Sequence, residues 1–167
     1  MGGQPSLVDH YVLAMAQPRD LFVARSPYPF LVGTAQLVHS EASTAEFPPS
    51  ADSSAADDRP KLVALAVRSG SGRTDHIRVG RTVDNDLPLQ HMRISRHHAH
   101  FSLDQTHWQL FDDGSRNGTW VEEARLQPKG PGHPLALGQA VRFAELEFTF
   151  LDAGRCWELL RSLTRNR

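Results

Sequence analysis

The sequence lacks features that disulfide-bonded, membrane-spanning and nucleic-acid-binding proteins require. It contains one cysteine, Cys156, which cannot form an internal disulfide and suits a reducing compartment. Its longest largely apolar run, around residues 30 to 38, is much shorter than a membrane-spanning helix needs. The net charge is −1, so there is no overall basic field to attract nucleic acid or an anionic membrane. We therefore expect a cytoplasmic protein that binds neither nucleic acid nor membrane.

Charge and residue types change along the chain near residue 60. The first 60 residues contain 3 Lys and Arg against 7 Asp and Glu, whereas the remainder contains 15 against 12. Residues 40–60 consist mainly of Ser, Ala, Asp, Glu and Pro, a composition that buries too little apolar surface to offset the loss of chain entropy. These differences predict an N-terminal extension over residues 1–39 and a flexible acidic linker over residues 40–60.

The N-terminal extension shows two local patterns. Apolar residues recur at helical spacing between residues 7 and 15 until Pro18, which predicts a short amphipathic helix. Between residues 20 and 38, Pro27 and Pro29 interrupt further apolar residues. We expect one short helix followed by one strand-like segment in this second part.

From residue 61 onward, short apolar runs are separated by turn residues. Residues 62–67 form a continuous apolar run, and apolar residues alternate with polar ones near residues 99–103, 108–110, 141–143 and 146–150. This pattern is typical of an all-β sandwich or barrel. After it, Asp152 is placed to cap a C-terminal helix over residues 152–167, with Trp157, Leu160 and Leu163 on one side.

Three clusters at predicted strand ends have the composition of an anion-binding surface. Gly80 and Arg81 follow one strand, residues 94–99 precede a second, and residues 115–119 precede a third. Together they offer guanidinium groups, hydroxyls, an amide and backbone N–H groups at turns. A phosphate monoester is bound by these donors, with arginine as a permanently charged fork. Loops at one end of a sandwich would bring them together.

The order and approximate spacing of these clusters resemble the pattern GR…ND…SxxHA…SxNGT of the forkhead-associated (FHA) family. The resemblance covers residues 61–151 and rests on the segments 80–81, 85–87, 95–99 and 115–119. It implies an FHA-like two-sheet antiparallel β-sandwich that holds a phosphothreonine peptide in loops at one end. The family usually has Asn-Gly soon after the NGT strand, whereas this chain has Glu122 and Glu123.

The resemblance also implies roles for individual residues. Arg81 and Ser95 would contact the phosphate, and Arg96 would assist them. Asn117, together with Arg116, would hold the peptide backbone beside the phosphorylated residue. Four residues would shape the loops: Gly80, His98, Gly118 and Thr119.

Two other kinds of site match fragments of the same region. The histidines within residues 97–100 suggest zinc, but a structural zinc site normally needs four ligands and the single cysteine is far away in sequence. A hydrolase triad of Ser95, His98 and an aspartate at 112 or 113 would lack a nucleophile-elbow motif. We therefore expect no catalytic residue, metal or cofactor.

Two functional hypotheses follow. The favoured one is a phosphothreonine-dependent adaptor in Ser/Thr kinase signalling, whose partner is a phosphothreonine-containing protein such as a Ser/Thr kinase or its substrate. The alternative is a structural or oligomerising FHA-like domain that does not read phosphate and uses its sandwich face or terminal helices as an interface. The presence of Arg81, Ser95 and Asn117 disfavours the alternative.

Overall fold

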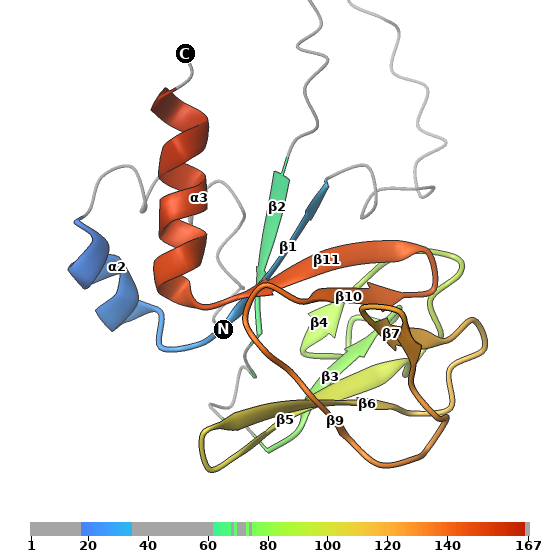
Figure 1. Cartoon of the computed structure of the whole chain (residues 1–167). Helices are drawn as coiled ribbons and strands as arrows, with labels where there is room; N and C mark the ends of the chain where they lie inside the picture. The colour runs from blue at the N-terminus through green and yellow to red at the C-terminus, as the bar shows by residue number, and fades with distance from the viewer. Residues whose placement is uncertain (1–17, 35–61, 68, 70–72, 74, 166–167) are drawn as a thin grey trace, which may run out of the picture.

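The structure of the chain is a computed structural model that describes residues 18–34, 62–67, 69, 73 and 75–165 (Figure 1). The helix expected around residues 7–15 and the linker expected over residues 40–60 both lie outside the described residues.

The described part of the N-terminal extension contains the predicted helix and strand. Helix α2 (Arg19–Arg25) is followed by strand β1 (Phe30–Thr34). In the sheet, β1 lies between β2 (Leu62–Ala66) and β11 (Leu146–Leu151) and is antiparallel to both. Although β1 precedes residue 61, it is thus a strand of the sandwich itself. The domain boundaries drawn from the sequence stay a prediction.

The strands form two sheets, as the sequence predicts. One sheet has six strands in the order β2-β1-β11-β10-β7-β8, and the other has five in the order β4-β3-β5-β6-β9. The remaining strands are β3 (Ile77–Gly80), β4 (Leu87–Pro88), β5 (Ala99–Asp104), β6 (His107–Asp112), β7 (Thr119–Val121), β8 (Ala124–Arg125), β9 (His133–Pro134) and β10 (Ala140–Phe143). Pairing is antiparallel in the registers described except between β3 and β4, which are parallel. The chain is thus an all-β, FHA-like sandwich.

The core lies between the inner faces of the two sheets. Phe101 of β5 packs edge-on against Phe143 of β10 and stacks with Phe150 of β11, at ring-centroid distances of 6.2 Å in both cases. All three side chains are buried because alternate residues of each strand point inward. Burial of these large aromatic side chains stabilises the sandwich and fixes the strand ends that carry the loops.

A second apolar cluster covers part of the outer face of the six-stranded sheet. Helix α3 (Ala153–Arg165) begins where the Asp152 carboxylate accepts a hydrogen bond from the backbone N–H of Arg155 at 2.7 Å, so the predicted cap is confirmed. Phe22 of α2, Phe30 of β1 and Cys156 of α3 are buried together. The helix stands over β1 and β11 (Figure 1). None of the described helices is long and apolar enough to span a membrane.

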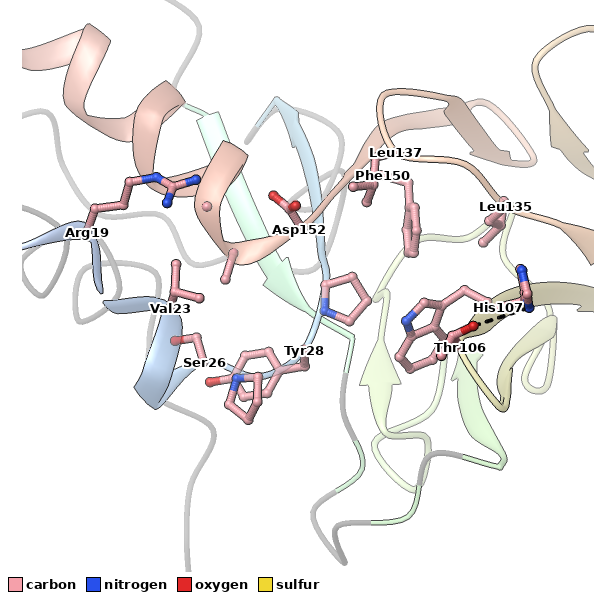
Figure 2. Close-up of a pocket in the computed structure, with 15 residues that line it drawn as sticks. Arg19, Val23, Ser26, Tyr28, Thr106, His107, Leu135, Leu137, Phe150 and Asp152 are labelled. Carbon is pink, nitrogen blue, oxygen red and sulfur yellow. Dashed lines mark hydrogen bonds between the residues drawn. The ribbon is translucent and has the colours of Figure 1, made fainter. Parts of the chain in front are cut away.

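A cavity of about 450 Å³ separates these helices from the end of the sandwich formed by the β5–β6 turn. Its lining includes Tyr28, Trp108 and Phe150, with Arg19 and Asp152 on the helical side (Figure 2). Because β5 and β6 are antiparallel, this turn lies at the opposite end of the sandwich from the loops that precede β5 and follow β6. The cavity is therefore separate from the clusters predicted to bind an anion.

Candidate functional site

The three predicted clusters meet at one end of the sandwich. Val79 of β3 pairs with Ala99 of β5, which in turn pairs with Asp112 of β6, so the loops beyond these residues lie side by side. Backbone hydrogen bonds continue the pairing into the loops, from His98 N–H to the Val79 carbonyl at 2.9 Å and from Asp113 N–H to the His98 carbonyl at 3.0 Å. The segments that the sequence places far apart therefore form one surface.

The loop that carries Arg81 is tied to the loop that carries Arg96. The side-chain amide of Asn85 donates to the carbonyl oxygens of Thr82 at 2.8 Å and of Arg96 at 2.7 Å. Gly80 lies against the same contact, since a Cβ atom there would collide with the Arg96 carbonyl. The glycine thus permits the close approach of the two loops, and the guanidinium of Arg81 remains exposed to solvent.

Ser95 occupies the junction of all three loops. Its carbonyl accepts a hydrogen bond from the backbone N–H of Arg81 at 2.9 Å, and its Oγ accepts one from the backbone N–H of Arg116 at 3.0 Å. A serine hydroxyl can donate one hydrogen bond while it accepts others. Within the described part of the chain, no group takes the hydroxyl proton of Ser95. That proton can therefore be donated to an anion beside Arg81.

His98 lies beneath this junction and is fully buried. Its Nδ1 accepts a hydrogen bond from the backbone N–H of Ser95 at 3.1 Å, so the proton of the neutral ring is on Nε2, which donates to the Gly118 carbonyl at 2.9 Å. Burial lowers the pKa of His98 from its ordinary value, and the contact with Gly118 opposes that shift. The neutral ring connects the second loop to the third.

The third loop is folded around the buried carboxylate of Asp112. One oxygen accepts from the backbone N–H groups of Gly114 and Ser115, both at 2.9 Å. The other accepts from the hydroxyls of Ser115 at 2.5 Å and Thr119 at 2.6 Å. Burial alone would raise the pKa of Asp112, but these hydrogen bonds outweigh it and hold the pKa below its ordinary value. The ionised carboxylate therefore shapes the loop that presents Arg116 and Asn117.

Asn117 faces the loop before β5. Its side-chain amide donates to the carbonyl oxygen of Arg93 at 2.7 Å. The next residue, Gly118, has a φ of +91°, a conformation that side chains rarely adopt, and a Cβ there would lie 2.6 Å from the ring of Trp120. The glycine thus allows the sharp turn that aims Asn117 at Arg93.

The turn after β7 accommodates the departure from the family pattern. Val121 pairs with Ala124, so Glu122 and Glu123 form the turn of a tight hairpin. Glu122 adopts a φ of +51°, and its carboxylate accepts a hydrogen bond from the backbone N–H of Ala140 at 2.8 Å. This contact holds a non-glycine residue in the left-handed conformation that Asn or Gly favours.

Positive charge without carboxylate partners gathers at this end of the molecule. Four exposed arginines carry it: Arg81, Arg93, Arg96 and Arg116. Elsewhere, arginines form ion pairs with carboxylates, such as Arg73 with Asp75 at 2.7 Å. No such pair involves the four loop arginines among the residues that the structure describes. The four guanidinium groups are therefore open to an anion from outside.

The structure places every predicted site residue in these loops or at the strand ends beside them, and it adds two that sequence reasoning missed. Arg93 enters the site only because Asn117 binds its carbonyl oxygen, and nothing in the sequence pattern indicates this contact. Asp112 did have a signal. Asp112 precedes Gly114 and Ser115 by two and three residues. This spacing is typical of an Asx turn, in which the aspartate carboxylate accepts hydrogen bonds from those backbone N–H groups.

The alternative sites do not assemble. The ring of His98 accepts from the backbone of Ser95, not from its hydroxyl, so the two residues do not form a nucleophile and base. His100 does not share a face with His98, because it lies on the outer side of β5, where it stacks on Phe111 and contacts Asp113 at 2.7 Å. The described residues contain no group of three His, Cys, Asp or Glu that could hold a metal ion.

Comparison with known proteins matches part of the chain to one family. Residues 77–144 match the family model of the FHA domain. The chain is 36% identical over 78 residues to the transcriptional regulatory protein EmbR of Mycobacterium tuberculosis, covering 46% of this chain and 19% of that protein. It is 35% identical over 72 residues to the glycogen accumulation regulator GarA of Mycolicibacterium smegmatis, covering 43% of each. The chain thus spans less than half the length of these relatives.

Comparison with solved structures gives matches of lower sequence identity. A structure of Mycobacterium tuberculosis EmbR in complex with a low-affinity phosphopeptide has 22% identity and a TM-score of 0.47, covering 75% of this chain and 24% of that one. The FHA domain of the CT664 protein from Chlamydia trachomatis has 21% identity and a TM-score of 0.49, covering 74% of this chain and 97% of that one.

Proposed function

The chain contains a forkhead-associated domain, whose family model matches residues 77–144, and from this premise we propose that the protein binds phosphothreonine-containing proteins through the loops around Ser95. FHA domains are interaction modules that recognise phosphorylated or acidic motifs with arginine clusters. The protein is accordingly an adaptor in Ser/Thr kinase signalling, and it does not act as an enzyme.

The observation that carries this proposal is the junction of three loops at Ser95. Four exposed arginines, none of them in an ion pair with a carboxylate among the described residues, lie on the loops that meet at Ser95, whose hydroxyl proton is not engaged there. A phosphothreonine brings a charge of about −1.5 to −2 and three acceptor oxygens, so it satisfies several of these donors at once. An unmodified threonine offers a single hydroxyl and no negative charge, so it would leave the charge of the arginines unneutralised.

The contacts support a division of labour within the site. We assign the phosphate to Arg81 and Ser95, which share a hydrogen bond between their backbones, and give Arg96 an assisting role. Asn117, with Arg116, holds the peptide backbone. In the structure Asn117 donates to the Arg93 carbonyl, and a peptide carbonyl of the ligand would be an equivalent acceptor.

The remaining predicted residues support the loops in this proposal. Gly80 permits the close contact between the loops, and Gly118 permits the turn at Asn117. His98 and Thr119 hold the loops from below through Gly118 and Asp112. The partner is a phosphothreonine-containing protein, namely a Ser/Thr kinase or a kinase substrate.

A binding screen tests the proposal and identifies the preferred motif. The chain is immobilised and exposed to an oriented peptide library with phosphothreonine at a fixed position, and to the same library with threonine there. We expect capture of the phosphorylated library and selection at positions near the phosphothreonine. Equal capture of both libraries would instead favour a structural or oligomerising domain that does not read phosphate.

A further inference from the structure

A row of three side chains crosses the outer face of the six-stranded sheet. Trp120 of β7 is the register partner of Arg125 on β8 and of Arg142 on β10. The guanidinium carbon of Arg142 lies 4.2 Å from the ring centroid of Trp120, and that of Arg125 lies 5.3 Å from it. We call these three residues the Arg–Trp–Arg row. Both distances are within the range of cation–π contacts.

Arg142 is a charged group without an anionic partner among the residues that the structure describes. Its side chain is half-buried, and its Nε is buried without a hydrogen-bond partner among the residues described. Glu147 of β11 is its register partner, yet no ion pair joins the two within 4.0 Å. A partly desolvated charge is costly unless it is paired. Contact with the indole ring compensates only in part, so an external anion would be favourable here.

The row adjoins the loop of the proposed phosphopeptide site. At Gly118, a Cβ would meet the ring of Trp120 at 2.6 Å and the Nε of Arg125 at 3.0 Å. Gly118 follows Asn117, which faces the loop of Arg93. The row is therefore the continuation of the basic loop surface onto the sheet. Helix α3 stands over β1 and β11. Among the described elements it therefore does not cover the part of the outer face that holds the row (Figure 1).

We propose that the Arg–Trp–Arg row is a second contact surface for the same phosphoprotein, and that it binds carboxylate side chains outside the phosphothreonine motif. The inference rests on the proposed function, because it takes the ligand to be anchored by its phosphothreonine at Ser95. Charge complementarity argues for acidic residues. Arg125 and Arg142 come from the strands on either side of Trp120, so they offer two separate donor groups, which suit successive carboxylates better than one compact anion.

Extended peptides distinguish binding at the Arg–Trp–Arg row from binding at the phosphate site. A phosphothreonine core from the library screen is compared with the same core extended at either end by a run containing aspartates or, in the matched control, asparagines. For the unmodified protein we expect the aspartate run at one end to tighten binding by roughly threefold to tenfold over the asparagine run. The double variant R125Q/R142Q should lose this gain and still bind the short core within about twofold.

Two further variants control for stability and charge. Arg161→Gln removes an arginine from a comparable stack on Trp157 of α3, where the guanidinium carbon is 5.2 Å from the ring, and should leave the gain intact. The double variant R125K/R142K keeps the charge and should retain most of the gain, with thermal melts confirming that each variant is folded.

Each contrary result has a distinct meaning. An aspartate run that adds nothing at either end, a gain that persists in R125Q/R142Q, or a complete loss in R125K/R142K would overturn the inference alone. A short core that binds equally with and without phosphate would overturn the proposed function and this inference with it. If a single-stranded oligonucleotide binds through Arg125 and Arg142 while the aspartate run adds nothing, the row is a nucleic-acid contact and the inference is wrong.

Discussion

The buried imidazole of His98 donates a hydrogen bond to the carbonyl oxygen of Gly118, 20 residues away, at 2.9 Å. On its other side the ring accepts from the backbone N–H of Ser95. One neutral side chain therefore fixes both the loop with the proposed phosphate-binding serine and the loop with Asn117. The geometry of the site depends on a residue that no ligand needs to touch.

Substitution of His98 by alanine should destabilise the fold and weaken phosphopeptide binding together. The variant leaves the Ser95 N–H and the Gly118 carbonyl without their partner and opens a cavity, so we expect a loss of about 2 to 4 kcal/mol in the free energy of unfolding. Urea unfolding measures this loss. His97→Ala is the control, because the side chain of His97 is 58% exposed. Equal stability of the two variants would contradict the bracing role of His98.

Mild acid should destabilise the domain through the same ring. The folded-state pKa of His98 lies below the ordinary 6.5 because burial disfavours the charged imidazole, and burial also lowers the pKa of His76. Below about pH 6.5 the unfolded chain therefore binds protons that the folded chain does not. The contribution of these two histidines to the free energy of unfolding is fully present above that pH. It is lost as the pH falls toward their folded-state pKa values.

Urea unfolding at a series of pH values checks this sign. From about pH 7.5 to about pH 5.5 the free energy of unfolding should fall, with a slope of up to about 1.4 kcal/mol per pH unit for each histidine. A free energy that rises over this interval would mean that the folded chain, not the unfolded one, binds the extra protons.

The Asp112 carboxylate should be essential for the third loop. Asp112→Asn replaces an acceptor by an NH₂ group that faces the donors of Ser115 and Thr119, so at least one buried donor loses its partner. We expect a loss of about 2 to 3 kcal/mol in the free energy of unfolding. Faster hydrogen exchange at the backbone N–H groups of Gly114 and Ser115 should accompany it. Asp104→Asn, at the opposite end of the β5 hairpin, is the matched control.

Much of the fold follows from the sequence because burial imposes a period of two on each strand. Residues 99–103 and 146–150 show this alternation, and both form strands with one buried face. Strand β1 was expected only as a strand-like segment, because Pro27 and Pro29 obscure its start. Its place between β2 and β11 depends on pairing with residues 28 to 36 positions away in β2 and 117 to 121 positions away in β11, which local pattern cannot specify.

The site was predictable only as far as its motifs extend. Arg81, Ser95 and Asn117 belong to the recognisable string, and the structure brings their loops together. Arg93 and the Arg–Trp–Arg row are created by contacts across loops and strands. Arginine and tryptophan both occur at ordinary protein surfaces, so their presence in the sequence indicates no site. Only the strand register and the turn at Gly118 show that these residues lie together.

Arg81→Ala and Ser95→Ala should each weaken phosphothreonine binding without unfolding the domain. A hydrogen bond to a charged group contributes about 1.5 to 3 kcal/mol, which corresponds to a loss of at least about tenfold in affinity. Isothermal titration calorimetry measures the affinity, and thermal melts report folding. Arg73→Ala, an exposed arginine paired with Asp75, is the matched control and should bind as the unmodified protein does. Unfolding of Arg81→Ala would assign that residue a structural role instead.

The most direct test of phosphate recognition is calorimetric titration of the chain with one selected peptide in two forms, with phosphothreonine and with unmodified threonine at the same position. The phosphate supplies most of the charge-assisted contacts available to the loops around Ser95. We predict measurable binding of the phosphorylated peptide and a loss of at least about tenfold in affinity without the phosphate. Equal affinity for the two peptides would contradict the account.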